Sequence, residues 1–301
     1  MKRLLSHLVI ALITFSFSLN ADGAESIRMR FVVSIYTDER GASLRHPESV
    51  FMEGKNLLVA DSQNSRLLRY TYEDRSIKGG TEIKVAQLTY PLHVKLNSKG
   101  EIYALDGRLN RIVMLSPVGE FKAYLTPVGI PSPESFAVVS FTTDSEDHIY
   151  ILDTLSRRVI QLNSEGSYQR HVTFPLESGS FTDVAVDSRG TIFIIDSGNA
   201  RVYSAAKDAP VFTPVGERLN KYVRCPTAIA VDRQGIIYLV DHNGASVLMI
   251  SQNGSVIGQQ LSMGWNDGLL YYPSQLCIND KGDVVIADRG NNRIQIFTVT
   301  K

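Results

Sequence analysis

A histidine, a serine and an aspartate, the three residue types of a Ser-His-Asp catalytic triad, occupy the same position in three similar segments of the chain. They are His93, Ser140 and Asp183, and Gln275 occupies the same position in another segment. A serine that is activated by a histidine, itself oriented by an aspartate, attacks carbonyl carbon atoms. Alternatively, His93, Asp183 and Gln275 offer nitrogen and oxygen ligands for zinc or calcium. Both chemistries require the segments to bring these side chains together.

The segments belong to a repeat in which an aspartate closes a strand-like run. These aspartates are Asp61, Asp106, Asp153, Asp196, Asp241 and Asp288, and the residues five positions later are Arg66, Arg111, Arg158, Arg201, Ser246 and Arg293. A period of 43 to 47 residues is typical of propellers and solenoids. So many copies cannot all be catalytic. We expect each aspartate to cap its turn by accepting backbone N–H groups, and each arginine to pair with an aspartate or a carbonyl.

Each repeat also contains alternating apolar and polar residues, which indicates β-strands. Examples upstream of the aspartates are "YPLHVKL" (90–96) and "FTDVAV" (181–186). The unit reads as strand a, turn, strand b ending at the aspartate, turn, strand c, loop and a weaker strand d. Four antiparallel strands form a propeller blade. The sequence therefore predicts an all-β fold, a six-bladed β-propeller of four-stranded antiparallel blades, as a single domain over residues 25–301.

The last unit, "YPSQLCINDKGDVVIADRGNNRIQIF" (272–297), carries the pattern most clearly. It resembles the NHL repeat, and the chain is similar to six-bladed NHL β-propellers over roughly residues 46–299. The resemblance implies a module that presents one face to a protein, a glycan or another polymer. It also implies two enzymatic alternatives: a lyase propeller that holds zinc with histidines near the axis, and a lactonase-like propeller with acidic metal ligands.

The two ends of the chain predict how the ring closes. The final unit stops after strand c, at "RIQIFTV", and has no strand d. The strand-like "RMRFVVSIY" (28–36) belongs to no unit of its own. We expect this N-terminal strand to close the last blade as its outer strand, because a closed ring leaves no unpaired edge there.

Strand a lies nearest the axis, and its alternate residues are expected to face a central tunnel. The predicted tunnel-lining residues are Ser49, His93, Ser140, Asp183, Gln275, Lys95 and Cys277. Sheet packing separates the inner strands of successive blades by about 10 Å, which disfavours a working Ser-His-Asp triad. We predict a hydrated polar tunnel in which water bridges these groups. No cofactor is predicted, and a tunnel-bound calcium or zinc ion is the alternative.

The b–c turns and the loops that lead into strand a share one face of the ring, and their residues vary between blades. Arginine, tyrosine and tryptophan on such loops are common binding anchors. The predicted binding residues on this face are Arg108, Arg157, His242, Arg289, Trp265, Tyr90 and Tyr272. For Trp265, the only tryptophan of the chain, the alternative is that it fills a gap between blades.

Residues 1–24 have the order of a secretory signal peptide: a basic start, the apolar run "LLSHLVIALITFSFSL" and a polar stretch with small residues. The alternative is a membrane anchor, but the run is shorter than the roughly 20 residues that span a bilayer. We therefore expect no transmembrane segment and a periplasmic or extracellular protein. Without residues 1–24 the chain has 29 basic and 30 acidic residues, and this balance disfavours nucleic acid as a partner.

The two cysteines, Cys225 and Cys277, differ in position within their units by five residues, or about 16 Å along a strand. A disulfide needs Cα atoms within about 7 Å, so no bridge is expected.

Together these observations predict an exported propeller, monomeric, that binds a protein or polymer through its loop face. The alternative is a metal-dependent enzyme with a site at the tunnel mouth, lyase-like or lactonase-like.

Overall fold

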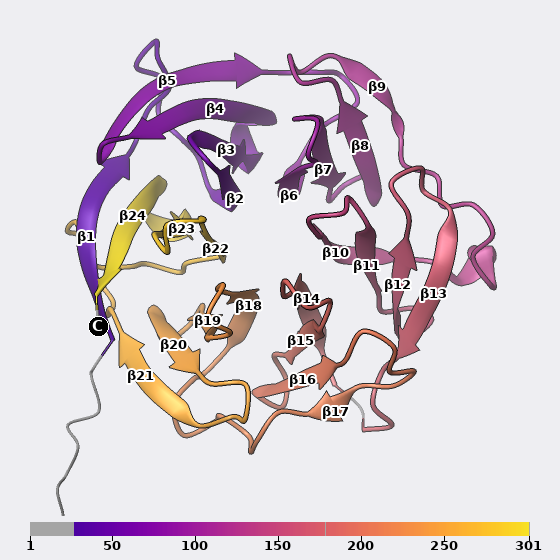
Figure 1. Cartoon of the computed structure of the whole chain (residues 1–301). Coiled ribbons are helices and arrows are strands. Elements are labelled where there is room, and N and C mark those ends of the chain that lie inside the picture. The colour runs from indigo at the N-terminus through magenta and orange to yellow at the C-terminus, as the bar shows by residue number, and fades with distance from the viewer. Residues whose placement is uncertain (1–26, 178, 301) are drawn as a thin grey trace, which may run out of the picture.

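The computed structural model describes residues 27–177 and 179–300, which form a ring of six four-stranded antiparallel sheets around a central axis (Figure 1). The all-β, six-bladed propeller predicted from the repeat is confirmed. The predicted signal peptide, residues 1–24, lies outside the described residues. Within those ranges no helix is both long enough and apolar enough to cross a membrane.

The first three blades follow one another along the chain, each from the axis outward. Blade 1 comprises β2 (Pro47–Glu53), β3 (Asn56–Asp61), β4 (Arg66–Glu73) and β5 (Ser76–Ile83). Blade 2 comprises β6 (Pro91–Leu96), β7 (Ile102–Asp106), β8 (Arg111–Leu115) and β9 (Phe121–Tyr124). Blade 3 comprises β10 (Val138–Thr143), β11 (Ile149–Asp153), β12 (Arg158–Leu162) and β13 (Tyr168–Thr173).

The other three blades complete the ring. Blade 4 comprises β14 (Phe181–Val186), β15 (Ile192–Asp196), β16 (Arg201–Ala205) and β17 (Thr213–Pro214). Blade 5 comprises β18 (Pro226–Val231), β19 (Ile237–Asp241), β20 (Ser246–Ile250) and β21 (Val256–Gln260). Blade 6 comprises β22 (Gln275–Ile278), β23 (Val284–Asp288), β24 (Arg293–Thr300) and the N-terminal strand β1 (Arg28–Ile35).

Strand β1 closes the ring, as the sequence predicts. It pairs antiparallel with β24, from Arg28 opposite Thr300 to Ile35 opposite Ile294. In Figure 1 the indigo N-terminal strand therefore lies beside the yellow C-terminal strand. The two ends of the described chain hold each other in one sheet, and the edge of β24 is covered.

The core lies between blades, because each sheet packs its two faces against its neighbours. In β7 all five residues are buried, and the second strands of blades 3 to 6 show the same pattern. Strands buried on both faces read as continuous apolar runs, which accounts for sequences such as "IYILD". Val50 of blade 1 and Val285 of blade 6 belong to one hydrophobic cluster, so apolar packing also spans the closure of the ring.

The repeated aspartates fasten the loops of the propeller. We call the segment before the innermost strand of each blade its incoming loop. Every repeated aspartate accepts at least one backbone N–H from its incoming loop, for example from Arg45 to Asp61 at 2.7 Å and from Tyr271 to Asp288 at 2.7 Å. In blades 2, 3 and 4 the carboxylate also accepts N–H groups of the b–c turn. The predicted backbone cap of the b–c turn is therefore confirmed in blades 2, 3 and 4, whereas the bond to the incoming loop, which was not predicted, is present in all six blades.

Four of the repeated arginines form the expected pairs, three with an aspartate and one with a carbonyl. Arg66, Arg158 and Arg293 lie 2.7, 3.0 and 2.7 Å from the carboxylates of their own repeat. Arg201 instead donates to the carbonyl of Gly216 at 3.4 Å. Arg111 forms neither kind of contact among the described side chains, and blade 2 therefore departs from the pattern.

Candidate functional site

The loop face holds a cavity of about 250 Å³ at the mouth of the central channel. Its lining residues are Glu48, Leu92, His93, Thr227, His242, Ser274, Gln275 and Arg289. They come from the inner strands of blades 1, 2, 5 and 6 and from the b–c turns of blades 5 and 6. The site is therefore assembled from segments that are far apart in the sequence, and we refer to it as the mouth pocket.

Glu48 and Arg289 form an ion pair in the mouth pocket. Arg289 Nε lies 2.8 Å from a carboxylate oxygen of Glu48, and the Tyr90 hydroxyl lies 3.4 Å from the same oxygen. Burial raises the pKa of Glu48 above its ordinary value, against the opposing effect of the Arg289 charge. The buried Nε–H of Arg289 is not aligned with any acceptor among the described residues. The pair is therefore an electrostatic contact that holds the Arg289 side chain at the pocket.

Two histidines bring further unsatisfied groups to the pocket. His242 contacts the carbonyl oxygen of Pro273 through Nδ1 at 2.9 Å, and its Nε2 has no partner among the described residues. His93 has no hydrogen-bond partner in the described part of the chain, and it borders both the mouth pocket and the channel below. Burial lowers the pKa of His93, which favours the neutral ring, and a neutral imidazole can both donate and accept a hydrogen bond.

A row of aromatic rings leads from the rim of the loop face to the mouth pocket. Trp265 lies 5.8 Å from Tyr271, Tyr271 lies 4.6 Å from Tyr272, and Tyr272 lies 5.2 Å from His242, measured between ring centroids. Trp265 is 74% exposed, so it does not fill a gap between blades. We call these four residues the aromatic row. Its continuity joins three of the predicted binding residues to one site.

The remaining predicted binding residues divide into two groups. Arg108 packs over the ring of Tyr90, with the guanidinium carbon 5.5 Å from the centroid, and Tyr90 in turn contacts Glu48. These residues border the mouth pocket through that contact. Arg157 instead donates to the carbonyls of Pro175 and Glu177, at 2.7 and 3.1 Å. It fastens the incoming loop of blade 4, which is a structural role that the sequence does not reveal.

Below the mouth pocket the channel contains a second cavity, of about 160 Å³. Five predicted tunnel residues line it: His93, Lys95, Asp183, Gln275 and Cys277. Burial lowers the pKa of Lys95 and raises the pKa of the Cys277 thiol to about 12. The Lys95 ammonium lies 5.2 Å from the centroid of the Phe51 ring. Cys225 lies in the incoming loop of blade 5, and both cysteines are free.

Two of the predicted tunnel-lining residues, Ser49 and Ser140, do not lie where we expected them. Both are fully buried and do not line the channel. Ser49 Oγ lies 3.3 Å from the Gln275 side-chain oxygen and accepts from the Val94 N–H at 3.3 Å, and Ser140 Oγ donates to Asp183 at 2.5 Å. The side chains therefore bond neighbouring blades directly, where we expected bridging water. The inner strands of neighbouring blades converge toward the axis. They therefore lie closer together there than packed sheets do, and their side chains can touch.

These contacts decide whether His93, Ser140 and Asp183 can form a catalytic triad and whether the channel can hold a metal ion. His93 has no hydrogen bond to Ser140 or Asp183, so the three side chains do not form a relay. Both carboxylate oxygens of Asp183 accept hydrogen bonds from other groups. Within residues 27–177 and 179–300, no three histidine, cysteine, aspartate or glutamate side chains gather in an arrangement that would hold a metal ion. The residues do not fit a metal site in the channel.

Four lining residues of the mouth pocket are not among the residues predicted from the sequence: Glu48, Leu92, Thr227 and Ser274. Each follows the proline, or its equivalent, at the start of an inner strand. A β-bulge at this point in blades 1 to 5 shifts the pairing register, as between Pro47 and Ser49. A bulge re-aims a side chain, and period-two alternation cannot show this. The residue after each proline varies between blades, and this variation is the sequence signal that could have identified these four residues.

Comparison with known proteins agrees with this architecture. Residues 270–297 match the NHL repeat family. The match covers the last of the six units, so the chain is a six-bladed β-propeller whose last blade contains an NHL repeat. No curated protein sequence matches the chain.

Solved structures share the fold at low sequence identity. A catalytically inactive virginiamycin B lyase from Staphylococcus aureus, determined with quinupristin, is similar with a TM-score of 0.61 and 14% identity over 90% of this chain and 85% of that one. A protein of unknown function from Bacteroides thetaiotaomicron gives 0.65 and 14% over 91% and 76%. The WD40 propeller domain of Doa1 gives 0.61 and 9% over 90% and 97%. These similarities concern the fold, which hosts both enzymes and binding modules.

Proposed function

We propose that the protein is a recognition module that binds a protein or polymeric ligand across its loop face. The observation that carries the proposal is the continuity of the aromatic row with the mouth pocket. An exposed tryptophan at one end is linked through Tyr271 and Tyr272 to His242, which lines the pocket. Aromatic side chains supply large contact areas at low entropic cost, and a ligand longer than the pocket would use both parts.

The polar groups of the mouth pocket support the same function. The Arg289 side chain is 33% exposed beside Glu48, and the His93 ring has no hydrogen-bond partner among the described residues. Buried polar atoms without partners are rare, and each calls for an explanation such as an ordered ligand or water molecule. A ligand segment with acceptor groups would satisfy the arginine, while its remaining length lies on the aromatic row.

The proposal includes a location outside the cytoplasm, because residues 1–24 have the order of a signal peptide. Fractionation of cells that express the full chain tests this part. We expect a processed protein in the exported fraction, and a chain of full length in the cytoplasm would contradict it.

A lyase-type reaction is the second candidate, favoured by one feature of the mouth pocket. Burial raises the pKa of Glu48 in a cavity that it shares with His242. A carboxyl group with a raised pKa and a histidine are the usual components of general acid–base catalysis. A lyase is among the proteins with a similar fold. Turnover that is lost in both Glu48→Gln and His242→Ala would support this candidate over pure binding.

Affinity electrophoresis in gels that contain soluble polysaccharides, together with retention on immobilised proteins, tests the recognition function. We expect at least one matrix to retain the protein, and retention to be lost when Trp265 and Arg289 are both replaced by alanine. Lys281→Ala provides the matched control, because Lys281 lies in an exposed a–b turn on the opposite face. Equal retention of all three proteins would contradict the proposal.

A further inference from the structure

The repeated arginine of blade 2 is released from the role that it has in three other blades. In blade 6, Arg293 lies 2.7 Å from Asp288 and donates to the carbonyls of Asn266 and Leu269 in its incoming loop. Arg111 is exposed and forms no ion pair with any side chain that the structure describes. Its guanidinium carbon lies 5.2 Å from the ring centroid of Tyr124. Among the described residues, this cation–π contact is the one interaction of the Arg111 guanidinium.

The length of the incoming loop explains the difference. The blades in which the arginine pairs with its aspartate have long incoming loops, at 36–46, 125–137 and 261–274. In blade 2 the loop is only 84–90, and Thr89 takes over the aspartate by donating both its N–H and its hydroxyl to Asp106. A short loop offers Arg111 no carbonyl, and the occupied carboxylate offers it no partner. The guanidinium therefore turns outward along the sheet.

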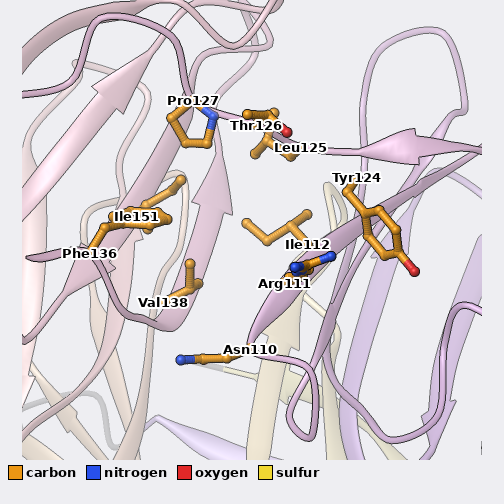
Figure 2. Close-up of a pocket in the computed structure, with 10 residues that line it drawn as sticks. All are labelled: Asn110, Arg111, Ile112, Tyr124, Leu125, Thr126, Pro127, Phe136, Val138 and Ile151. Atoms are coloured by element: carbon orange, nitrogen blue, oxygen red, sulfur yellow. The ribbon is translucent and has the colours of Figure 1, made fainter. Parts of the chain in front are cut away.

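Arg111 lines a cleft between blades 2 and 3, a cavity of about 410 Å³. Figure 2 shows Arg111 and Ile112 facing Phe136, Val138 and Ile151 across the cleft. Leu125, Thr126 and Pro127 cover one end and Asn110 lies at the other, as the same view shows. The volume lies in the usual range for small-ligand sites, about 300–1,000 Å³.

We infer that the cleft between blades 2 and 3 binds a small organic carboxylate with an apolar body, and that Arg111 holds the carboxylate. A guanidinium presents a planar fork of donors that matches a carboxylate in a bidentate pair. The stacked Tyr124 leaves the edge of this fork free and limits its motion. Phe121, whose ring centroid is 5.2 Å from that of Tyr124, supports the tyrosine.

The residues that line the walls of the cleft determine which kind of ligand body it accepts. Ile112, Phe136 and Val138 present aliphatic and aromatic surface, which gains from contact with apolar groups. One unpaired arginine matches a single negative charge better than a dianion. The site is also separate from the mouth pocket, because the two cavities share no lining residue. The inference therefore goes beyond the proposed function and does not depend on it.

Isothermal titration calorimetry with 4-phenylbutyrate, and with 4-phenylbutanol as the uncharged analogue, tests the inference. We expect the carboxylate to bind at least tenfold more tightly than the alcohol. Arg111→Gln is expected to remove this preference, and Arg111→Lys to retain part of it because the charge remains without the fork. Because Arg111 is exposed, both variants are expected to keep the thermal midpoint of the parent, which the same samples verify.

Arg201→Gln is the matched control. Arg201 occupies the same repeat position, and its guanidinium carbon lies 5.6 Å from the ring centroid of Tyr203, but it lies 3.7 Å from Glu177 and does not line the cleft. It is expected to leave 4-phenylbutyrate binding unchanged. Thr126→Trp, which fills the cleft without touching the charge, is expected to weaken the carboxylate and the alcohol alike. No heat of binding for the parent protein, or equal affinity in Arg111→Gln, would overturn the inference.

Discussion

The carboxylate of Asp183 in blade 4 accepts a hydrogen bond of 3.0 Å from the backbone N–H of Ile229 in blade 5. The other oxygen of the same carboxylate accepts the hydroxyl of Ser140 in blade 3 at 2.5 Å. One buried side chain thus joins three successive blades near the axis. Its chemistry resembles that of a catalytic aspartate, but its contacts are those of a structural fastener.

Replacement of Asp183 by alanine is expected to lower the free energy of unfolding by about 3 kcal/mol, because buried donors on Ser140 and Ile229 lose their acceptor. Asp183→Asn retains one acceptor oxygen and is expected to cost less. Urea unfolding followed by circular dichroism measures both. The control is Asp208→Asn, at an exposed position, with an expected change within about 0.5 kcal/mol. A loss in Asp183→Ala no larger than in this control would refute the fastener role.

The same substitution of the repeated arginine is expected to destabilise blade 6 strongly and blade 2 hardly at all. Arg293 is 1% exposed and bonded to Asp288, to Tyr36 and to two loop carbonyls, so Arg293→Lys is expected to cost about 3 kcal/mol or more. Arg111→Lys, at the corresponding exposed position, is expected to cost less than about 0.5 kcal/mol. Thermal unfolding of the two variants side by side measures the difference. Similar losses would show that blade 2 does not depart from the repeat.

The thiol of Cys277 is expected to resist alkylation until the fold opens. Burial raises its pKa to about 12, so the reactive thiolate is scarce at pH 8 and increases only as the pH approaches that value. With Cys225→Ser to isolate Cys277, we expect iodoacetamide to react at least about 100-fold more slowly in the native state than in guanidinium chloride. Mass spectrometry of the peptide measures the rate. Comparable rates in both states would contradict a closed channel.

Elemental analysis of protein purified without chelator tests for metal in the channel. We expect less than stoichiometric zinc or calcium, because Asp183 already accepts hydrogen bonds through both oxygens. His93→Ala is the control variant. One equivalent of metal in the parent that is lost from His93→Ala would contradict this expectation and favour the enzymatic candidate.

The repeat made the fold predictable, whereas the site was predictable only in part. The spaced aspartates and the alternation of each strand a are local features, and they fix the blades and the closing strand. Two features of the axis are not local. The bulge at Pro47 aims Glu48 into the mouth pocket, and convergence of the inner strands lets Ser140 reach Asp183. Neither a register shift nor an interstrand distance is contained in residue spacing.

The roles of residues in the variable loops were likewise predictable only in part. Trp265 and Tyr272 were selected for their type and position, and the aromatic row joins them to His242. Arg157 was selected on the same grounds, but it fastens a loop through Pro175. Side-chain type alone does not distinguish an anchor for a ligand from an anchor for the chain.

Trp265 allows the most direct test of the recognition function. It is the only tryptophan of the chain and is 74% exposed at the outer end of the aromatic row, so its fluorescence reports on the loop face alone. The decisive measurement is titration of this fluorescence with soluble oligosaccharides and peptides, in the parent protein and in Arg289→Ala. The account predicts a saturable change with at least one class of ligand, and weaker binding in Arg289→Ala. An emission that no ligand changes, or equal affinity in the two proteins, would contradict it.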